Sequence, residues 1–377
     1  MSLPRRLDLT DLTRDHSVLL LGPRRTGKSW LLRTTLPADQ TYDLLRHDIY
    51  AELAARPSLL RERLQPSDRL VVIDEVQKLP VLMDEVHCLM ETTATRFVLS
   101  GSSARKLRRT HTGLMAGRAR TRYLHPLVSA ELPDFDLMRA LHTGLLPPVW
   151  LASDPWEELE GYVGEYLEQE VRAEALVRRI DGFARFLRTA ALANAELLNF
   201  ESIASDAQVP ARTVREHYAV LTDTLLGRMV EPRSTNRKAG GHAKFYFFDT
   251  GVVHRLLGVR YLPDDGAAFG KAFETWIAHE LAARISYHRL GMDLQFWRDR
   301  TGAEVDFVIG DHLAVEVKAS RSVADRDLKG LRKLSESVAF RHKIVVCREP
   351  APRRVGDIDI WPWQHFAQAW WAGELDP

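Results

Sequence analysis

Two stretches near the amino terminus decide the fold: Leu21-Gly-Pro-Arg-Arg-Thr-Gly-Lys-Ser29 and Leu70-Val-Val-Ile-Asp-Glu75. The first holds the pattern G-x-x-x-x-G-K-S, whose glycines let backbone N–H groups wrap phosphates closely. A short apolar run precedes this loop and a helical run follows it, so a helix amino terminus would face the phosphates. The second stretch is an apolar strand that ends in two carboxylates. Together the two patterns predict a nucleoside triphosphatase.

The chemistry of this predicted site needs a cation, a metal ligand and a base. Lys28 would reach the β- and γ-phosphates, and the Ser29 hydroxyl would ligate Mg²⁺. Asp74 would hold the same metal, while Glu75 would polarise the attacking water. The predicted cofactors are therefore ATP and Mg²⁺. The predicted nucleotide-binding loop consists of Gly22, Pro23, Arg24, Arg25, Thr26, Gly27, Lys28 and Ser29.

From Met1 to about Pro155 the pattern alternates between strands and helices, as in a parallel α/β sheet. Strands are predicted at 18–21, 41–45, 70–73 and 96–100. The last strand follows the acidic strand in order and ends in small hydroxyl residues. The candidates to sense the γ-phosphate are therefore Ser100 and Ser102. Of these, Ser100 is also predicted to be a nucleotide-binding residue. The alternative is an ordinary turn from strand to loop.

The segment 104–122 is strongly basic, with seven Lys/Arg and no acidic residue. Arg118, with Arg120 as the alternative, is the predicted arginine finger offered to a neighbouring subunit. A second interpretation has basic residues of this segment contacting nucleic-acid phosphates. The residues concerned are Arg105, Lys106, Arg108 and Arg109. A third is a solvated charged face.

The middle of the chain, residues 156–235, is predicted to be a helical lid with a winged-helix-like region. The turn Gln208-Val-Pro210 separates two short helical patterns, which is helix-turn-helix spacing. In a DNA-reading use, Arg212, Thr213 and Arg215 would face the groove. The alternative is a lid that packs on the ATPase core and touches no DNA.

Residues 244–377 contain a second group of candidate catalytic and metal-binding residues. Glu316 and Lys318 are two apart on one predicted strand and so share a face, and Asp306 ends a neighbouring strand. Carboxylates on neighbouring strands can hold Mg²⁺, which polarises a phosphodiester, and a lysine beside them can stabilise developing charge. Glu274, from a predicted helix, would complete the metal shell. The alternative is a sheet edge with alternating charges.

Composition sets broad limits on these hypotheses. The chain has 377 residues and a net charge of +1, so any nucleic-acid surface must be a local patch. Its two cysteines, Cys88 and Cys347, are predicted to be buried free thiols. No apolar run approaches the length of a membrane span and no secretory leader is recognisable, so a cytoplasmic location is expected.

The order of motifs resembles a bacterial and archaeal family, the AAA+-superfamily ATPases with a carboxy-terminal DUF4143 domain. The segments that carry the resemblance are Gly22–Ser29, Val72–Gln77, Leu99–Ser103, Leu114–Arg118, Phe245–Gly251, Gly270–Glu274, Glu304–Phe307 and Val315–Lys318. The resemblance implies an ATPase core at 1–155 and a terminal domain at 236–377 similar to the PD-(D/E)xK restriction-endonuclease fold. The positions that match the site of that fold are Glu274, Asp306, Glu316 and Lys318.

Three functions are compatible with these patterns. The first is an ATP-driven enzyme that acts on DNA and cleaves it with the terminal domain. The second is a non-cutting ATPase switch that uses this domain as a scaffold for docking DNA or protein. The third is a signalling or toxin-regulating ATPase that touches no nucleic acid. A homo-oligomer is expected, and by analogy a hexameric ring.

Overall fold

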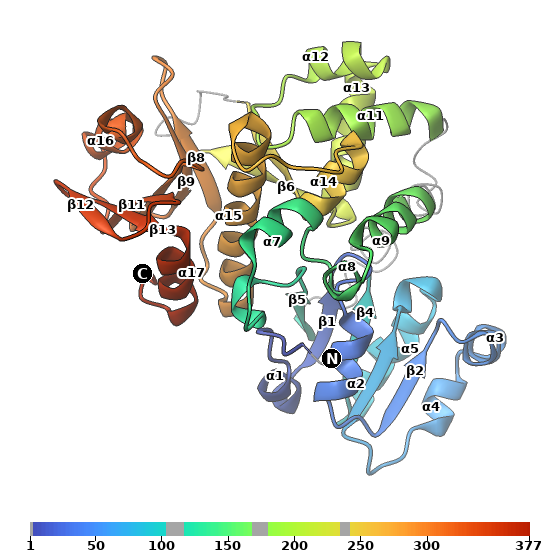
Figure 1. Ribbon diagram of the computed structural model, residues 1–377. Helices are drawn as coiled ribbons and strands as arrows, with labels where there is room; N and C mark the ends of the chain where they lie inside the picture. Colours follow the sequence, from blue (N-terminus) through green and yellow to red (C-terminus); the bar gives the residue numbers. More distant parts are fainter. Residues whose placement is uncertain (1–2, 103–116, 168–179, 234–241) are drawn as a thin grey trace. The chain divides into compact units, whose positions relative to one another are not determined.

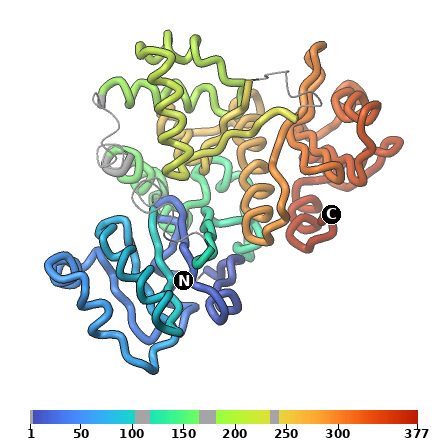
Figure 2. Tube along the Cα trace, turned by 180° about the vertical axis from the view of Figure 1, so that it is seen from behind, coloured from blue at the N-terminus to red at the C-terminus, as the bar shows by residue number. Residues whose placement is uncertain are grey.

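Figures 1 and 2 show the computed structural model, which describes residues 3–102, 117–167, 180–233 and 242–377. The chain divides into two compact units. The first comprises Met1–Pro126 with Asp223–Leu225, and the second comprises Leu127–Thr222 with Leu226–Pro377. The three-domain division expected from the sequence differs from this, because its boundaries at residues 155 and 235 both fall inside the second unit.

The first unit is built on a five-stranded parallel sheet with the strand order β2-β3-β4-β1-β5. Its strands are β1 (Ser17–Leu21), β2 (Gln40–Asp43), β3 (Leu70–Asp74), β4 (Arg96–Gly101) and β5 (Ala119–Tyr123). β3 is buried along its whole length, which is why it reads as a continuous apolar run. Because β4 lies between β1 and β3, the loops after these three parallel strands meet at one edge of the sheet.

The helices of the first unit complete its core. They are α1 (Thr10–Asp15), α2 (Lys28–Thr35), α3 (His47–Ala55), α4 (Leu59–Arg63) and α5 (Leu82–Thr92), with the short 3-10 helix η1 (Val76–Lys78). One core cluster contains Leu82 and Val86 of α5 together with Ile73 of β3 and Phe97 of β4. This cluster fixes the acidic end of β3 against its neighbours.

The predicted strands of this sheet are confirmed, with small differences at their ends. The strand expected at 41–45 runs over Gln40–Asp43. β5 is not among the predicted strands, and it accounts for the last part of the basic segment. Ser17 of β1 pairs with Ala119, so β5 lies at the open edge of the sheet. Charged residues are common on such edges because they discourage pairing with other chains.

The second unit begins with helices. They are α7 (Leu137–Thr143), α8 (Pro147–Leu151), α9 (Pro155–Gly161), the π-helix η3 (Tyr162–Leu167), α11 (Ile180–Leu192), α12 (Phe200–Ala207), α13 (Ala211–Asp223) and α14 (Thr250–Leu257). The rings of Phe186 and Tyr218 are 5.0 Å apart, and those of Tyr218 and Phe245 are 4.9 Å apart. Helices α11 and α13 therefore share an aromatic core with a strand that follows them.

That strand belongs to an antiparallel hairpin of β6 (Gly227–Pro232) and β7 (Lys244–Phe247). Leu197, between α11 and α12, forms a bridge to Lys244 at the start of β7. β6 also pairs in parallel with β8, where Glu231 lies opposite Gln295. The hairpin thus joins the helices to the large sheet of the same unit.

The large sheet has eight strands in the order β12-β13-β11-β10-β9-β8-β6-β7. The strands after the hairpin are β8 (Leu294–Arg298), β9 (Glu304–Ile309), β10 (Leu313–Val317), β11 (His342–Cys347), β12 (Arg353–Val355) and β13 (Ile358–Pro362). β8, β9 and β10 form an antiparallel meander, whereas β10, β11 and β13 pair in parallel. The accompanying helices are α15 (Gly266–His288), η4 (Asp325–Leu328), α16 (Lys329–Ser335) and α17 (Trp363–Ala372).

Helix α15 is apolar on most of its circumference, as a buried helix must be. Near its middle, the carboxylate of Glu280 accepts hydrogen bonds from the Ser129 amide (2.8 Å), Trp276 Nε1 (3.0 Å) and Trp371 Nε1 (2.5 Å). Burial raises the pKa of Glu280 to about 7. This carboxyl group therefore ties α15 to α17 and to the start of the unit.

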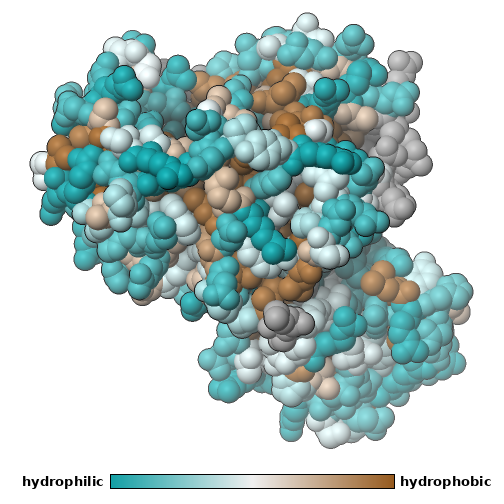
Figure 3. All heavy atoms as spheres, in the orientation of Figure 1, coloured by the Kyte–Doolittle hydropathy of each residue, from teal (hydrophilic) through white to brown (hydrophobic). Residues whose placement is uncertain are grey.

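Hydrophilic residues cover most of the face seen in Figure 3. Among the described residues, no helix has the length and apolar character needed to cross a membrane. Cys347 is buried as predicted, but the prediction is wrong for Cys88, which is exposed. The buried face of α5 carries Val86, and a residue two positions later points to the opposite side of a helix.

Candidate functional site

The loop after β1 has the close packing that phosphate binding requires. A Cβ on Gly22 would lie 2.4 Å from the carbonyl oxygen of Leu124, so only glycine fits at this position. Gly27 has φ 92°, in the left-handed region that glycine adopts without strain. Helix α2 begins at the next residue, Lys28, so its unpaired N–H groups lie at the loop.

Lys28 is held inside this loop. Its side chain is buried, and Nζ donates to the carbonyl oxygens of Gly22 (2.9 Å) and Pro23 (3.0 Å). The hydroxyl of Thr26 also donates to Pro23, at 2.7 Å. The backbone of the loop therefore surrounds the ammonium group of Lys28. Of the other predicted loop residues, Arg24 and Ser29 are half-buried and Arg25 is exposed.

A residue outside the motif, Arg5, is bonded to the loop. Its guanidinium donates to the carbonyl oxygen of Thr26 at 2.5 Å. The same group donates to the carbonyl oxygens of His125 (2.6 Å) and Pro126 (3.3 Å), just after β5. Arg5 therefore fastens the phosphate loop to the segment that leaves the sheet. No motif in the sequence marks this residue.

The carboxylates at the end of β3 lie beside the end of β4. The Ser100 hydroxyl donates to Asp74 Oδ1 and accepts a 3.1 Å hydrogen bond from the Glu75 amide. All three residues are buried. Ser100 therefore fixes both acidic residues, and the pairing of β3 with β4 places it beside them. A role for Ser100 in sensing phosphate stays a prediction.

Glu75 is further positioned by a residue that sequence reasoning missed. The amide Nε2 of Gln77 donates to Glu75 Oε2 and, at 3.0 Å, to the Ser102 hydroxyl. Glu75 itself has φ 60° and ψ 43°, a left-handed conformation that strains a residue with a side chain. Such strain often accompanies functional positions, and here it turns the Glu75 side chain toward Gln77. The sequence feature that could have revealed Gln77 is its position two residues after Glu75, at the end of the segment Val72–Gln77 that carries the family resemblance.

The predicted arginine finger lies at the opposite end of the sheet from the phosphate loop. Arg118 directly precedes β5, whose first residue pairs with Ser17 at the start of β1. The strand β1 spans roughly 16 Å between that end and the loop. Arg118 forms an ion pair with Glu91 of α5, and Arg120 is exposed on β5. Arg118 therefore cannot serve its own loop, and action on a neighbouring subunit stays a prediction. The phosphate-contact candidates Arg105, Lys106, Arg108 and Arg109 lie outside the described residues.

The second predicted site forms a convergent group in the second unit. Val315 of β10 pairs with Phe307 of β9, and the amide of Val317 donates to Asp306 Oδ2 at 2.8 Å. Lys318 Nζ donates to Glu316 Oε1 at 2.6 Å. Glu274 faces the same group from α15, because its carboxylate and that of Asp306 both approach Nζ of Lys244. The predicted convergence is therefore present.

Lys244, the first residue of β7, is a member of this group that the sequence did not reveal. Its Nζ lies 2.6 Å from Glu304 Oε1, 3.1 Å from Glu274 Oε1 and 3.6 Å from Asp306 Oδ1. The hydroxyl of Tyr246, two residues along the same strand face, donates to Glu274 Oε1 at 2.5 Å. We call the four carboxylates Glu274, Glu304, Asp306 and Glu316 the acidic cluster.

The electrostatics of the acidic cluster follow from burial and crowding. Burial, together with the charge of Asp306, raises the pKa of Glu274 to about 7. The same two causes raise the pKa of Glu316 well above its ordinary value. Burial opposes the charge on Lys244, but three neighbouring carboxylates outweigh it, so the pKa of Lys244 is raised. The cluster thus keeps Lys244 charged, while Glu274 and Glu316 hold their protons more tightly than free carboxyl groups do, as their raised pKa values indicate.

The arrangement does not fit the predicted metal set of Glu274, Asp306 and Glu316. Across the described ranges, no three His, Cys, Asp or Glu side chains are grouped as metal ligands. The physical reason is that Lys244 reaches in among the carboxylates and supplies the positive charge they need. Repulsion between the acids is therefore offset mainly by Lys244, with Lys318 serving Glu316.

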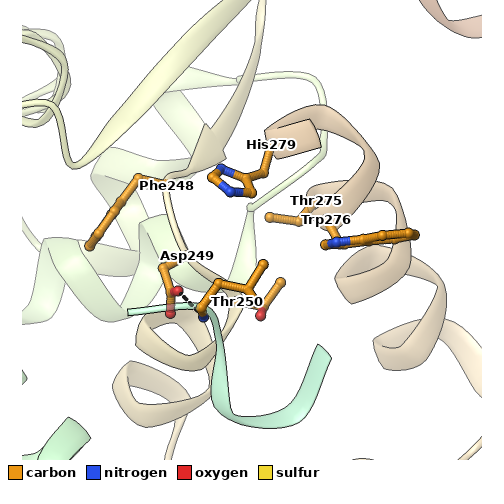
Figure 4. Close-up of a pocket in the computed structure, with 7 residues that line it drawn as sticks. Phe248, Asp249, Thr250, Thr275, Trp276 and His279 are labelled. Atoms are coloured by element: carbon orange, nitrogen blue, oxygen red, sulfur yellow. Dashed lines mark hydrogen bonds between the residues drawn. The ribbon is translucent and has the colours of Figure 1, made fainter. Parts of the chain in front are cut away.

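The segment Phe245–Gly251, one of those that carry the family resemblance, has a structural role. Asp249 accepts hydrogen bonds from the amides of Leu145 (2.6 Å) and Val252 (3.1 Å), and thereby caps α14. Burial raises the pKa of Asp249 to about 6. Figure 4 shows Asp249 and Thr250 opposite side chains of α15 that include His279. A Cβ on Gly251 would lie 2.1 Å from the carbonyl oxygen of Thr143, so this segment packs α14 tightly against α7.

The candidate DNA-reading residues lie on α13. Arg212 is exposed and forms an ion pair with Glu216 at 3.1 Å. Arg215 is exposed too, and its guanidinium stacks 5.0 Å from the ring centre of Phe200. Thr213 is half-buried. Both arginines therefore have their guanidinium groups at the surface of the unit.

A glycine-containing loop before a helix, a buried lysine in that loop and two carboxylates at the same sheet edge define a P-loop nucleotide-binding domain. Three segments of the chain match known domain families. Residues 14–132 match the family described as an AAA domain. Residues 134–262 and 269–366 match two domains of unknown function, DUF8612 and DUF4143. The predicted AAA and DUF4143 resemblances are confirmed, whereas the nuclease-like character of the last domain stays a prediction.

Two mycobacterial proteins are similar to most of this chain. Uncharacterized protein Rv2008c of Mycobacterium tuberculosis and uncharacterized protein Mb2031c of Mycobacterium bovis are each 27% identical over 311 residues. The similarity covers 79% of this chain and 68% of each relative. The Aeropyrum pernix Orc1 protein in complex with DNA is similar over 64% of this chain and 86% of its own, with 13% identity and a TM-score of 0.27. The Bacillus subtilis DNA clamp loader delta protein is similar over 55% and 84%, with 13% identity and a TM-score of 0.23. These TM-scores are too low to support a conclusion.

Proposed function

We propose that the protein is a Mg²⁺-dependent ATP hydrolase whose site lies at the P-loop edge of the first unit. One observation carries the proposal: β4 lies between β1 and β3, so the loop of Lys28 and the carboxylates of Asp74 and Glu75 meet at one sheet edge. The matching AAA domain model supports it.

The residues at this edge suit the steps of hydrolysis. Lys28 would exchange its two carbonyl partners for phosphate oxygens, which it binds as a point charge. The Ser29 hydroxyl and the Asp74 carboxylate are hard oxygen donors of the kind that Mg²⁺ prefers. When bound, Mg²⁺ would neutralise charge on the β- and γ-phosphates. Glu75, held through one oxygen by Gln77, would use the other to orient the attacking water.

The experiment is ATP hydrolysis by the full chain and two variants. Lys28→Ala should abolish tight ATP binding, because it removes ground-state contacts with the phosphates. Glu75→Gln should still bind ATP but stall hydrolysis, because Glu75 acts mainly on the attacking water. Binding is followed with a fluorescent ATP analogue and hydrolysis by phosphate release. Normal hydrolysis by Glu75→Gln would contradict the assignment.

We further propose DNA as a partner of the α12–α13 region. The order helix, bridge, helix, helix and hairpin is that of a winged helix, and Arg212 and Arg215 are exposed on α13. Replacing both arginines by alanine should weaken duplex binding, measured by fluorescence anisotropy, and reduce its salt dependence. Arg326→Ala, an exposed arginine on η4, is the matched control. Unchanged binding in the double variant would favour the lid interpretation.

For the acidic cluster the geometry favours the non-cutting alternative. Lys244 lies beside three of the four carboxylates and supplies positive charge where a catalytic metal would sit, so we propose that the second unit serves as a docking scaffold. The predicted DNA cleavage can be tested directly. Plasmid DNA is incubated with the full chain and Mg²⁺ or Mn²⁺, with and without ATP. Nicking that disappears in Asp306→Ala, while ATP hydrolysis survives, would restore the nuclease hypothesis.

A further inference from the structure

The charge at the centre of the acidic cluster belongs to the protein itself. The side chain of Lys244 is 5% exposed, and its ammonium group has three N–H donors. Three carboxylate oxygens lie around it, at 2.6, 3.1 and 3.6 Å. The ring of Phe296, whose centre is 5.6 Å from Nζ, lies over the same ammonium group. Lys244 is thus surrounded by acceptors and an aromatic face, as a specifically bound cation would be.

We propose that Lys244 is the resident cation of the acidic cluster and excludes divalent metal ions from it, so that removing its charge creates a divalent-cation site. This inference is independent of the proposed ATP hydrolysis, because it concerns residues of the second unit alone.

Geometry makes the two cations mutually exclusive. Mg²⁺ and Mn²⁺ bind carboxylate oxygens at about 2.1 Å, whereas the ammonium nitrogen is 2.6–3.6 Å from the same oxygens. A metal ion would have to draw the acids inward into the volume that Nζ occupies. It would also meet a buried positive charge at that point. The metal can therefore enter only if the ammonium group leaves.

Charge supplies the driving force once Lys244 is neutralised. Four carboxylates and the two ammonium groups of Lys244 and Lys318 make up the group. Without Lys244, buried acids would be left with one lysine, and an uncompensated buried charge is strongly destabilising. A divalent ion is the smallest replacement that offsets this repulsion while accepting oxygen ligands.

The cluster also holds an acceptor that Lys244 does not satisfy. Glu316 is 7% exposed, and its Oε2 is buried with no hydrogen-bond partner in the described part of the chain. Its other oxygen accepts from Lys318. Buried acceptors without partners are rare in native proteins, so this oxygen remains available to a ligand that enters the cluster. This oxygen is a further ligand for a divalent ion beside the carboxylates that Lys244 now holds.

The test is Mn²⁺ binding by isothermal titration calorimetry on the full chain without nucleotide. All proteins carry Asp74→Asn, so that the carboxylate at the P-loop edge does not contribute. Adding Lys244→Met should tighten Mn²⁺ binding roughly tenfold or more over this parent. Lys244→Arg keeps the charge and should behave like the parent. Adding Asp306→Asn to Lys244→Met should return the affinity to the parent value.

Thermal unfolding keeps the proposal testable if Lys244→Met folds poorly. Lys244→Gln, which keeps a polar end, is measured beside it. Both should melt below the parent, and Mn²⁺ should raise their melting temperatures by about 3 °C or more, but not that of the parent. The proposal is overturned if the parent binds Mn²⁺ through Asp306 despite Lys244. It is also overturned if neither variant gains affinity or stability from Mn²⁺.

Discussion

Arg5 and Thr26 are joined by a hydrogen bond of 2.5 Å from the guanidinium to the carbonyl oxygen of the phosphate loop. The same guanidinium holds two carbonyl groups of the segment that leaves β5. The loop is therefore anchored by a residue outside the motif. A loop held in this way loses less conformational freedom when phosphate binds.

Arg5→Ala is expected to raise the KM for ATP roughly tenfold with a smaller effect on kcat, because the loss of charge-assisted hydrogen bonds loosens the loop before phosphate binds. Arg5→Lys should rescue little, since an ammonium group cannot bond in the planar fork geometry of guanidinium. Steady-state ATP hydrolysis checks both variants. Arg6→Ala, at the exposed neighbouring position, is the control. An unchanged KM in Arg5→Ala would mean that the bonds are structural only.

Gln77→Ala is expected to lower kcat roughly tenfold while leaving the KM for ATP nearly unchanged. Gln77 donates to one oxygen of Glu75, and without that bond the carboxylate loses its orientation toward the attacking water. Single-turnover hydrolysis measures the effect. In a Glu75→Gln background the same change should have no further effect, because the two residues act as a unit. Additive losses in the double variant would contradict this coupling.

Arg118→Ala is expected to lower turnover while leaving nucleotide affinity nearly intact, because a finger acts mostly in the transition state. Arg118 lies at the end of the sheet away from its own loop, so the effect must come from a neighbouring subunit. Hydrolysis per protomer should therefore rise with protein concentration. Glu91→Ala, which removes the observed ion-pair partner, is the companion variant. Flat turnover in a sample shown to be monomeric would count against the assignment.

Glu280 gives the second unit a pH dependence of unusual sign for a carboxyl group. Its pKa is raised from 4.5 to about 7 in the folded chain, so the folded state binds the proton more tightly than the unfolded state. This stabilisation is complete below pH 4.5 and is lost as the pH rises to 7 and above. Glu280→Gln should remove about 3 kcal/mol of the difference in unfolding free energy between pH 4.5 and pH 8. Urea denaturation at the two pH values measures it, and an unaltered difference would contradict the prediction.

The sequence predicts the first unit well, because its sheet is made of buried parallel strands that read as continuous apolar runs. The P-loop and the acidic end of β3 are local motifs, and parallel pairing then brings them to one edge. β5 was harder, since an edge strand with arginines at Arg120 and Arg122 has the same composition as a solvated basic loop. Arg5 is about 120 residues from His125 and Pro126, whose carbonyl groups it binds, and no local pattern encodes such a contact.

For the second site, the sequence predicted the acidic residues but not the lysine at their centre, Lys244. Strand alternation places Glu316 with Lys318, and a short hairpin brings Asp306 beside them. Lys244 belongs to β7, about 60 residues before Asp306 in the sequence. Its partner Glu304 could not be told from a charged residue on an exposed strand face. A lone lysine that opens the apolar run Lys244–Phe248 was the one available signal. Its meaning depends on tertiary packing, which periodicity does not specify.

The pairing of β6 with β8 limits how this protein can be divided or recombined. A fragment that starts at residue 236 would leave β8 without β6 and expose unpaired backbone groups at Gln295 and Phe296, which favours aggregation. Exchange of the carboxy-terminal part between relatives would require matching partners on both sides of this seam. The helices before β6 and the sheet after it match two separate domain families, yet this pairing means that they are expected to fold as one unit.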